Sequence, residues 1–201
     1  MIWEKNIKLI IMTCETTEGK SKKCYFYWPK LPTTFSSNEI KLNNGYKINA
    51  VSEKNISDNL TQRNFLISNT ISNEKKEVTQ LHFRNWPDHG VPDLVQNFET
   101  FERINEIIYK HSETYKSASP VVVHCSAGVG RTGTIISIFQ IFYITKKHLE
   151  KNLNNLNLNI FNITRKLKEQ RRYMVQTSVQ YEMIYKFTYI MLKKFALTFK
   201  K

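Results

Sequence analysis

The sequence predicts an α+β domain built around a mixed sheet. Short apolar segments of strand length fill most of the first half of the chain, and longer segments with helical periodicity fill the second half. A β-branched run at residues 121–123 lies between two helical segments, which indicates one further strand far from the others in sequence. Strands first and helices later, with one late strand, are typical of the α+β class.

The strand candidates are separated by polar stretches. Residues 7–13 form an almost unbroken apolar run, which predicts a buried strand, whereas residues 15–22 are polar and contain Gly19, which predicts a loop. Three further runs are rich in β-branched and aromatic residues and predict an antiparallel meander: residues 46–51, 65–70 and 78–83.

The helical candidates follow. Residues 95–111 place their apolar side chains on one face of a helix. Pro120 then precedes the β-branched run, which we expect to be fully buried. The remaining segments are a mostly apolar helix, an Asn- and Leu-rich loop and two closing helices, at residues 131–148, 149–159, 160–172 and 177–195.

Composition limits the protein class. Thirty Lys and Arg against 17 Asp and Glu give a net charge of +13, which fits either a basic surface for an acidic partner or a bias toward Lys, Asn and Ile. Three cysteines form neither a disulfide framework nor a His/Cys pattern with zinc spacing, so we expect no metal and no cofactor, with Cys14 and Cys24 as structural thiols. No signal peptide or membrane-length apolar run is visible. The cysteine pattern favours reduced thiols and a cytoplasmic location. We also expect a monomer and, because no nucleic-acid-binding motif is present, no nucleic-acid partner.

The segment at residues 121–133 is the most informative one. A strand ends at His124, a turn of small residues follows, and a helix begins. Gly128, Gly130 and Gly133 allow the backbone to curl with its N–H groups directed inward, and the helix N-terminus adds its positive dipole end. The segment therefore predicts an anion-binding cradle of phosphate size.

Cys125 lies inside this cradle. The dipoles that bind an anion also favour a thiolate, so we expect a depressed pKa and a nucleophilic sulfur. Arg131 can donate two hydrogen bonds to phosphoryl oxygens, and the hydroxyl of Thr132 can donate to the thiolate. A lone cysteine at a strand end is more often inert. The glycines also have the spacing of a dinucleotide-binding loop, but a cysteine in that loop and the lack of an acidic ribose partner argue against a nucleotide site.

The string His-Cys-Ser-Ala-Gly-Val-Gly-Arg-Thr-Gly, at residues 124–133, resembles the signature loop of the tyrosine-specific protein phosphatases. Other segments resemble this family in the same order, from Met1 to about Tyr189: residues 1–4, residues 23–29, the acid loop at 86–92 and the glutamine loop at 170–181. Dual-specificity phosphatases usually lack the last two loops. The resemblance implies a single protein tyrosine phosphatase domain over residues 1–201, with helices on both faces of the sheet in three layers (α/β/α-like).

The resemblance also implies a mechanism. Cys125 attacks phosphorus and forms a phosphocysteine, while Asp88 protonates the leaving phenolate and therefore needs a raised pKa. Gln176 positions the water that hydrolyses the intermediate, and Gln180 assists. Glu18 occupies the family position that pairs with the signature arginine.

The remaining roles also come from the resemblance. His124 and Thr132 join the catalytic group, and Trp86 supports the acid loop. The expected substrate-binding residues are Ser126, Ala127, Gly128, Val129, Gly130, Arg131, Gln176, Asp88 and His89. Without the resemblance, Asp88 would be a turn residue after Pro87, and Gln176 part of the N-terminal cap of the last helix.

The sequence departs from the family in one respect. The family domain normally carries several dozen residues before the segment matched by Met1, including a Lys-Asn-Arg-Tyr loop that walls the phosphotyrosine ring, so we expect an N-terminally truncated domain. Two functions follow: hydrolysis of phosphotyrosine in proteins, or a catalytically weak or inactive phosphotyrosine-binding remnant or decoy. The composition and His89 are similar to tyrosine phosphatases of the bracoviruses, which would place the protein in the cytoplasm of a host cell.

Overall fold

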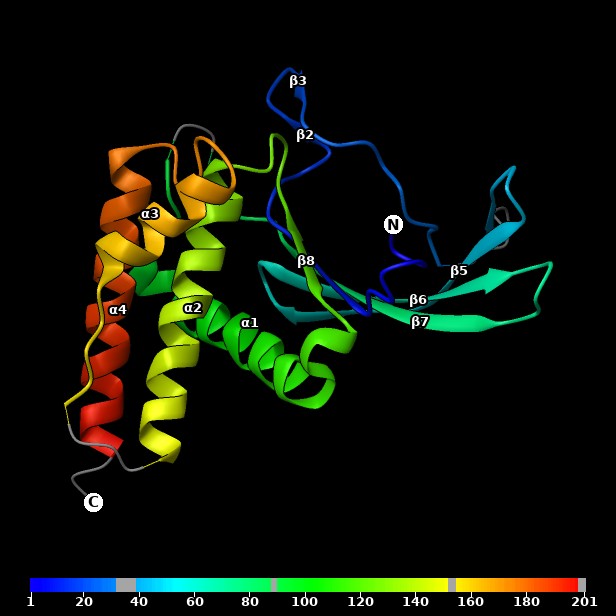
Figure 1. Ribbon diagram of the computed structural model, residues 1–201. Coiled ribbons are helices and arrows are strands. Elements are labelled where there is room, and N and C mark those ends of the chain that lie inside the picture. Colours follow the sequence, from blue (N-terminus) through cyan, green and yellow to red (C-terminus); the bar gives the residue numbers. More distant parts are fainter. Residues whose placement is uncertain (32–38, 88–89, 152–154, 199–201) are drawn as a thin grey trace. The chain divides into compact units, whose positions relative to one another are not determined.

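The computed structural model describes residues 1–31, 39–87, 90–151 and 155–198 (Figure 1). The contacts within the chain divide it into two compact units. The sheet unit comprises Met1–Asn85 and Lys110–Ser126, and the helical unit comprises Trp86–Tyr109 and Ala127–Lys201.

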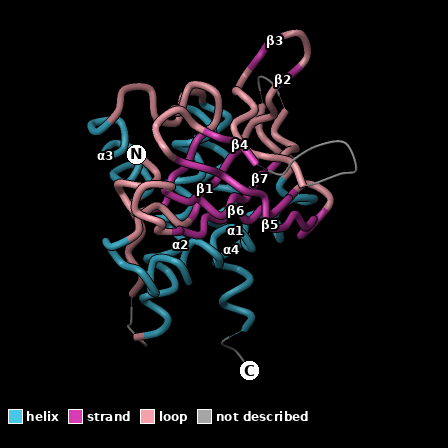
Figure 2. Tube along the Cα trace, turned by 90° about the vertical axis from the view of Figure 1, so that its right-hand side faces the viewer, coloured by secondary structure: helices cyan, strands magenta, loops and turns pink. Residues whose placement is uncertain are grey.

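The sheet unit contains a six-stranded mixed sheet in the order β4-β5-β6-β7-β1-β8, and Figure 2 shows its strands in magenta. A separate hairpin pairs β2 with β3. The strands are β1 (Leu9–Met12), β2 (Thr17–Glu18), β3 (Ser21–Lys22), β4 (Glu39–Lys41), β5 (Tyr46–Ser57), β6 (Leu60–Asn69), β7 (Lys75–Phe83) and β8 (Val121–His124).

The predicted meander is confirmed, because β5, β6 and β7 pair antiparallel in sequence order. The strand β1 pairs parallel with both β7 and β8, which makes the sheet mixed. All four residues of β1 are buried, as the apolar run predicts. The strand β5 continues to Ser57, six residues past its apolar run, because its outer half is exposed or half-buried and tolerates polar side chains.

Two expectations for this unit need correction, and one strand was not expected. The strand β8 is half-buried and not fully buried, because it is an edge strand with β1 as its one neighbour in the sheet. The segment at residues 15–22 is not wholly a loop, since it contains the hairpin β2–β3. The short strand β4 has no periodic apolar pattern, so the sequence did not predict it. It is recognised as a strand by its antiparallel pairing with β5.

The helical unit contains α2 (Gly130–Glu150), α3 (Ile160–Gln170) and α4 (Ser178–Thr198), with most of α1 (Leu94–Tyr115). The end of α1 and a 3-10 turn at Lys116–Ala118 belong to the sheet unit. All four helices occur where the periodicity predicts them. Aromatic rings pack α1 against α4, where the centroids of Phe98 and Phe187 lie 5.1 Å apart, and pack α2 against α4 through Phe142 and Phe195.

The mixed sheet and the helices that the described residues form confirm the α+β class. No helix among the described residues is long and apolar enough to cross a membrane. The expectation of a single domain over residues 1–201 remains a prediction.

A buried polar network joins β6 and β7. Arg63 donates through Nη1 to Gln80 Oε1 at 3.0 Å and lies 3.1 Å from Nδ1 of His82. A guanidinium can only donate, so Nδ1 of His82 accepts, and Nε2 donates to the carbonyl oxygen of Cys14 at 2.8 Å. The imidazole is therefore neutral, and burial lowers the pKa of His82 to about 4.

This pKa predicts acid sensitivity of the fold. Because the folded-state pKa of His82 lies below the unfolded value of about 6.5, the unfolded chain binds the proton first, and stability is lost as the pH falls from about 6.5 toward about 4. Urea unfolding should show a loss of about 2 kcal/mol from this group between pH 7 and pH 5. His82→Gln should flatten this slope. The same slope in both proteins would show that another group carries the pH dependence.

Candidate active site

Cys125 follows β8 directly and is buried, with 8% of its surface exposed. The preceding side chain, His124, is held at both ring nitrogens. Nδ1 lies 3.1 Å from the carbonyl oxygen of Cys125, and Nε2 lies 2.8 Å from the hydroxyl of Tyr27. Burial lowers the pKa of His124, so the imidazole that precedes the cysteine is neutral near pH 7.

The turn between β8 and α2 has the local features that the sequence predicts. Gly128 has a φ of +70°, which a residue with a side chain rarely adopts, so glycine is required there for the turn. The first turn of α2 carries no acidic side chain. The positive end of the helix dipole is therefore not neutralised by its own helix, as an anion site requires.

The first turn of α2 lies against the glutamine loop at very short range. A Cβ atom on Gly133 would lie 2.5 Å from the backbone nitrogen of Val175. The carbonyl of Val129 accepts hydrogen bonds from the amides of Gly133, at 2.8 Å, and Val175, at 3.3 Å. Val175 has a φ of 56°, an unusual conformation for a β-branched residue. Such strain persists only where the surroundings impose it, and it is frequent at functional sites.

Both predicted glutamines lie beside Gly130. A Cβ atom there would lie 2.9 Å from Nε2 of Gln180 and 3.3 Å from Oε1 of Gln176. Gln180 also helps to cap the N-terminus of α4: its Oε1 accepts from the amides of Gln176, at 2.9 Å, and Thr177, at 3.3 Å, while Oγ1 of Thr177 accepts from the amide of Gln180. This is a capping box, so Gln180 has a structural role in addition to the role that the resemblance implies.

Arg171 is a site residue to which the sequence assigned no role. Its Nη2 donates to the carbonyl oxygen of Ala127 at 3.1 Å, and its guanidinium lies 3.4 Å from where a Cβ on Gly128 would be. Arg171 therefore supports the turn and adds a positive charge beside it. Its position next to Gln170 in the glutamine loop was the one available signal, and that signal does not reveal the contact.

Trp86 and Glu18, two further residues predicted for the site, both lie among the described residues. Trp86 is buried, and its indole nitrogen donates to the carbonyl of Gly90 at 3.0 Å. Asp88 and His89 lie outside the described residues. Glu18 is in β2, and its Oε1 accepts from the backbone amide of Glu15 at 3.2 Å.

The helical unit thus brings Gly130, Gln176 and Gln180 together. The other residues predicted for the signature turn are divided between the two units. Thr132 is buried in the first turn of α2, Arg131 is half-buried there, and Val129 directly precedes that helix. Ser126 is exposed, and it is the last residue of the sheet unit.

Comparison with known families matches residues 1–189 to the protein-tyrosine phosphatase family. The chain belongs to this family. Its helices and mixed sheet also match the catalytic domain of human protein tyrosine phosphatase non-receptor type 18, with a TM-score of 0.77 and 26% identity over 94% of this chain and 62% of that one.

Curated relatives include human tyrosine-protein phosphatase non-receptor type 14, which is 30% identical over 92% of this chain and 15% of its own length. The putative receptor-type tyrosine-protein phosphatase mosPTP-1 of Culex quinquefasciatus is 37% identical over 92% of this chain and 12% of its own length. Tyrosine-protein phosphatase 2 of Dictyostelium discoideum is 31% identical over 92% of this chain and 45% of its own length. The chain therefore spans less than half the length of these relatives.

The contact at Gly133 predicts a specific sensitivity. Gly133→Ala places a methyl group against backbone atoms of Met174 and Val175, which cannot rotate away as a side chain could. We expect a loss of about 1–3 kcal/mol in the free energy of unfolding, measured with denaturant. Ile144→Ala, at an exposed position of the same helix, is the control and should cost less. Equal losses would show that Gly133 is not required for this approach.

Proposed function

We propose that the protein hydrolyses phosphotyrosine in other proteins through a phosphocysteine intermediate on Cys125. The observation that carries this proposal is the turn itself: a buried cysteine at the end of β8, followed by Gly128 at positive φ and a helix whose first turn lacks acid. These features support an anion-binding turn with a nucleophile at its start. Family membership supports phosphotyrosine as the phosphate ester.

In the first step, the Cys125 thiolate attacks phosphorus in line with the leaving tyrosyl oxygen. The P–O bond breaks as the S–P bond forms, and Asp88 gives its proton to the leaving phenolate. Arg131 and the backbone N–H groups of residues 126–131 hold the three equatorial oxygens, whose negative charge a guanidinium fork can match.

In the second step, water attacks phosphorus and the S–P bond breaks. Asp88, now a carboxylate, takes the proton from the water, and inorganic phosphate and the Cys125 thiolate are formed. Gln176 positions the water, and its side-chain oxygen beside Gly130, at the first turn of α2, supports this role. Gln180 assists through its side-chain nitrogen, Nε2, because its Oε1 already accepts the hydrogen bonds that cap α4.

The expected substrates are phosphotyrosine-containing proteins, and no cofactor takes part in either step. A cytoplasmic location, a monomeric state and an origin in a bracovirus remain predictions from the sequence. The competing function is a decoy that binds phosphotyrosine without turnover.

Cys125→Ser separates these two functions. Removal of the nucleophile should lower the hydrolysis of an aryl phosphate by about 10³-fold or more, because serine is a much poorer nucleophile at neutral pH. The release of inorganic phosphate measures turnover, and circular dichroism checks the fold. If the unaltered protein and the variant release phosphate at the same low rate while both bind a phosphotyrosine peptide, the decoy function replaces the enzyme.

Asp88→Asn tests the general acid. We expect kcat to fall by about 10²–10⁴-fold for phenyl phosphate, whose leaving group needs a proton. The loss should be much smaller for an aryl phosphate with an electron-withdrawing group, because that phenolate leaves without protonation. Steady-state kinetics with both substrates measures the contrast. Equal losses for the two substrates would contradict proton donation by Asp88.

A further inference from the structure

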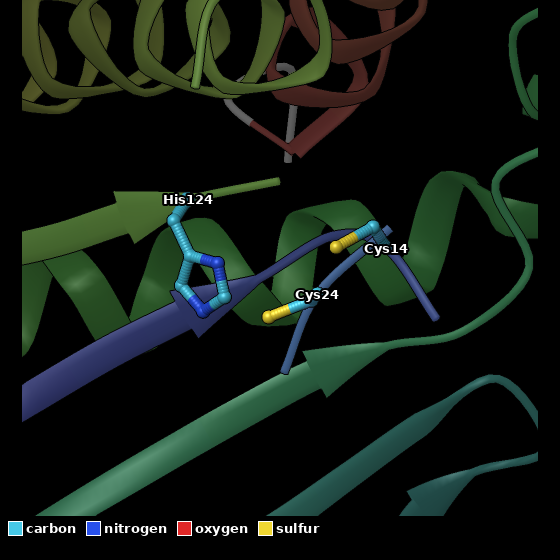
Figure 3. Close-up of side chains that lie close together, drawn as sticks. All are labelled: Cys14, Cys24 and His124. Carbon is cyan, nitrogen blue, oxygen red and sulfur yellow. The ribbon is translucent and has the colours of Figure 1, made fainter. Parts of the chain in front are cut away.

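Three soft donor side chains lie together in the sheet unit, although they are far apart in the sequence. The sulfur atoms of Cys14 and Cys24 and a ring nitrogen of His124 all lie within 4.8 Å of one another. Figure 3 shows both sulfur atoms turned toward the imidazole ring. Thiolate and imidazole are the ligands that Zn²⁺ prefers in proteins. We propose that Cys14, Cys24 and His124 form a zinc-binding site.

The register of the sheet produces this cluster. The strands β1 and β8 run parallel with Met12 opposite His124, so Cys14 leaves the sheet at the edge where β8 ends. The hairpin β2–β3 then returns the chain to this edge, because the amides of Lys23 and Cys24 both donate to the carbonyl oxygen of Thr16. His124 thus ends a strand, and backbone hydrogen bonds hold the two connecting segments that carry Cys14 and Cys24 close to it.

One ring nitrogen of His124 is held by a carbonyl oxygen, as is usual for a metal-binding histidine. Its Nδ1 lies 3.1 Å from the carbonyl oxygen of Cys125, and a histidine that binds a metal through one nitrogen usually donates the other N–H to such an oxygen. Nε2 is directed to the hydroxyl of Tyr27, at 2.8 Å. When a metal takes that position, the Tyr27 hydroxyl keeps its hydrogen bond from Gln80, at 2.7 Å.

The three donor atoms must move slightly closer together to bind zinc. In a tetrahedral zinc site, with Zn–S of about 2.3 Å and Zn–N of about 2.0–2.1 Å, ligand atoms lie about 3.5–3.8 Å apart. Donors within 4.8 Å of one another therefore need to approach by about 1 Å. Cys24 is half-buried, so its side chain can turn, whereas Cys14 is buried and fixed.

An entry path is present within the same unit. A cavity of about 590 Å³ is lined by Cys24, Tyr27 and His124, by the neighbouring Cys125 and Ser126, and by apolar residues of the sheet. Two of the three donors, Cys24 and His124, therefore face a space from which an ion can approach and in which water can serve as a fourth ligand, whereas Cys14 lies behind them. Each Zn–S bond forms as a thiol proton passes to solvent, and two thiolates neutralise the charge of the ion. Burial raises the pKa of Cys24, which keeps that thiol protonated until a metal competes for the sulfur.

The test uses the full chain, reduced and stripped of metal. Zn²⁺ is titrated in competition with a chromophoric chelator, and Co²⁺ serves as a spectroscopic probe because thiolate ligands give it a charge-transfer absorption band. We expect one ion per chain and a thiolate–cobalt band. Cys14→Ser and Cys24→Ser should each weaken zinc binding by about tenfold or more and diminish the band.

Cys125→Ser is the matched control, since it removes the neighbouring thiol that does not belong to the cluster. It should leave zinc affinity unchanged, and because binding is measured without substrate, the result does not depend on the phosphatase function. Cys24→His should bind zinc more tightly than Cys24→Ser, because it restores a ligand, and circular dichroism checks the fold of each variant.

Two results would overturn the proposal. Zinc binding that is lost in Cys125→Ser but kept in Cys14→Ser and Cys24→Ser would place the ion on the nucleophile instead. Absence of the cobalt band in the reduced chain, with a Cys14–Cys24 disulfide found by mass spectrometry after exposure to air, would make the pair a redox couple and not a metal site.

Discussion

The close approach of two backbone segments in the helical unit is the constraint on which the site depends most. The first turn of α2 and the chain at Met174–Val175 come so near that a methyl group at Gly133 has no room. Val175 adopts a left-handed conformation there, and its amide binds the carbonyl oxygen of Val129. This approach brings Gln176 and the capping box of α4 next to Gly130. One pair of packed backbone segments thus holds the first turn of α2 beside Gln176 and Gln180.

The sheet unit makes an independent contribution. The parallel strands β1 and β8 end together, so residues that follow one strand lie beside residues that end the other. His124 belongs to this edge and is directly followed by Cys125, while its ring lies near two other thiols. Burial keeps both His124 and His82 neutral, which leaves uncharged imidazoles on this side of the sheet.

Much of the fold could be predicted because its elements carry strong periodic patterns. The meander and the four helices have clear apolar periods, and the turn after β8 has glycines at positions where the backbone needs them. The burial of β8 was predicted wrongly, because an apolar run does not reveal whether a strand lies at the edge of its sheet. Arg171 and the cluster of Cys14, Cys24 and His124 could not be found by spacing, because pairing register and tertiary approach bring them together. Asp88 and Gln176 were assigned by resemblance, and their roles remain proposals.

Covalent catalysis by Cys125 is tested most directly by trapping of the phosphocysteine intermediate. An aryl phosphate is mixed with the protein and quenched in acid within milliseconds, and the peptides are then analysed by mass spectrometry. The account predicts one phosphoryl group on the peptide that contains Cys125, attached to sulfur, and its accumulation when Gln176 is replaced by alanine. Release of phosphate without any trapped adduct, or a phosphoryl group on Ser126 instead, would contradict it.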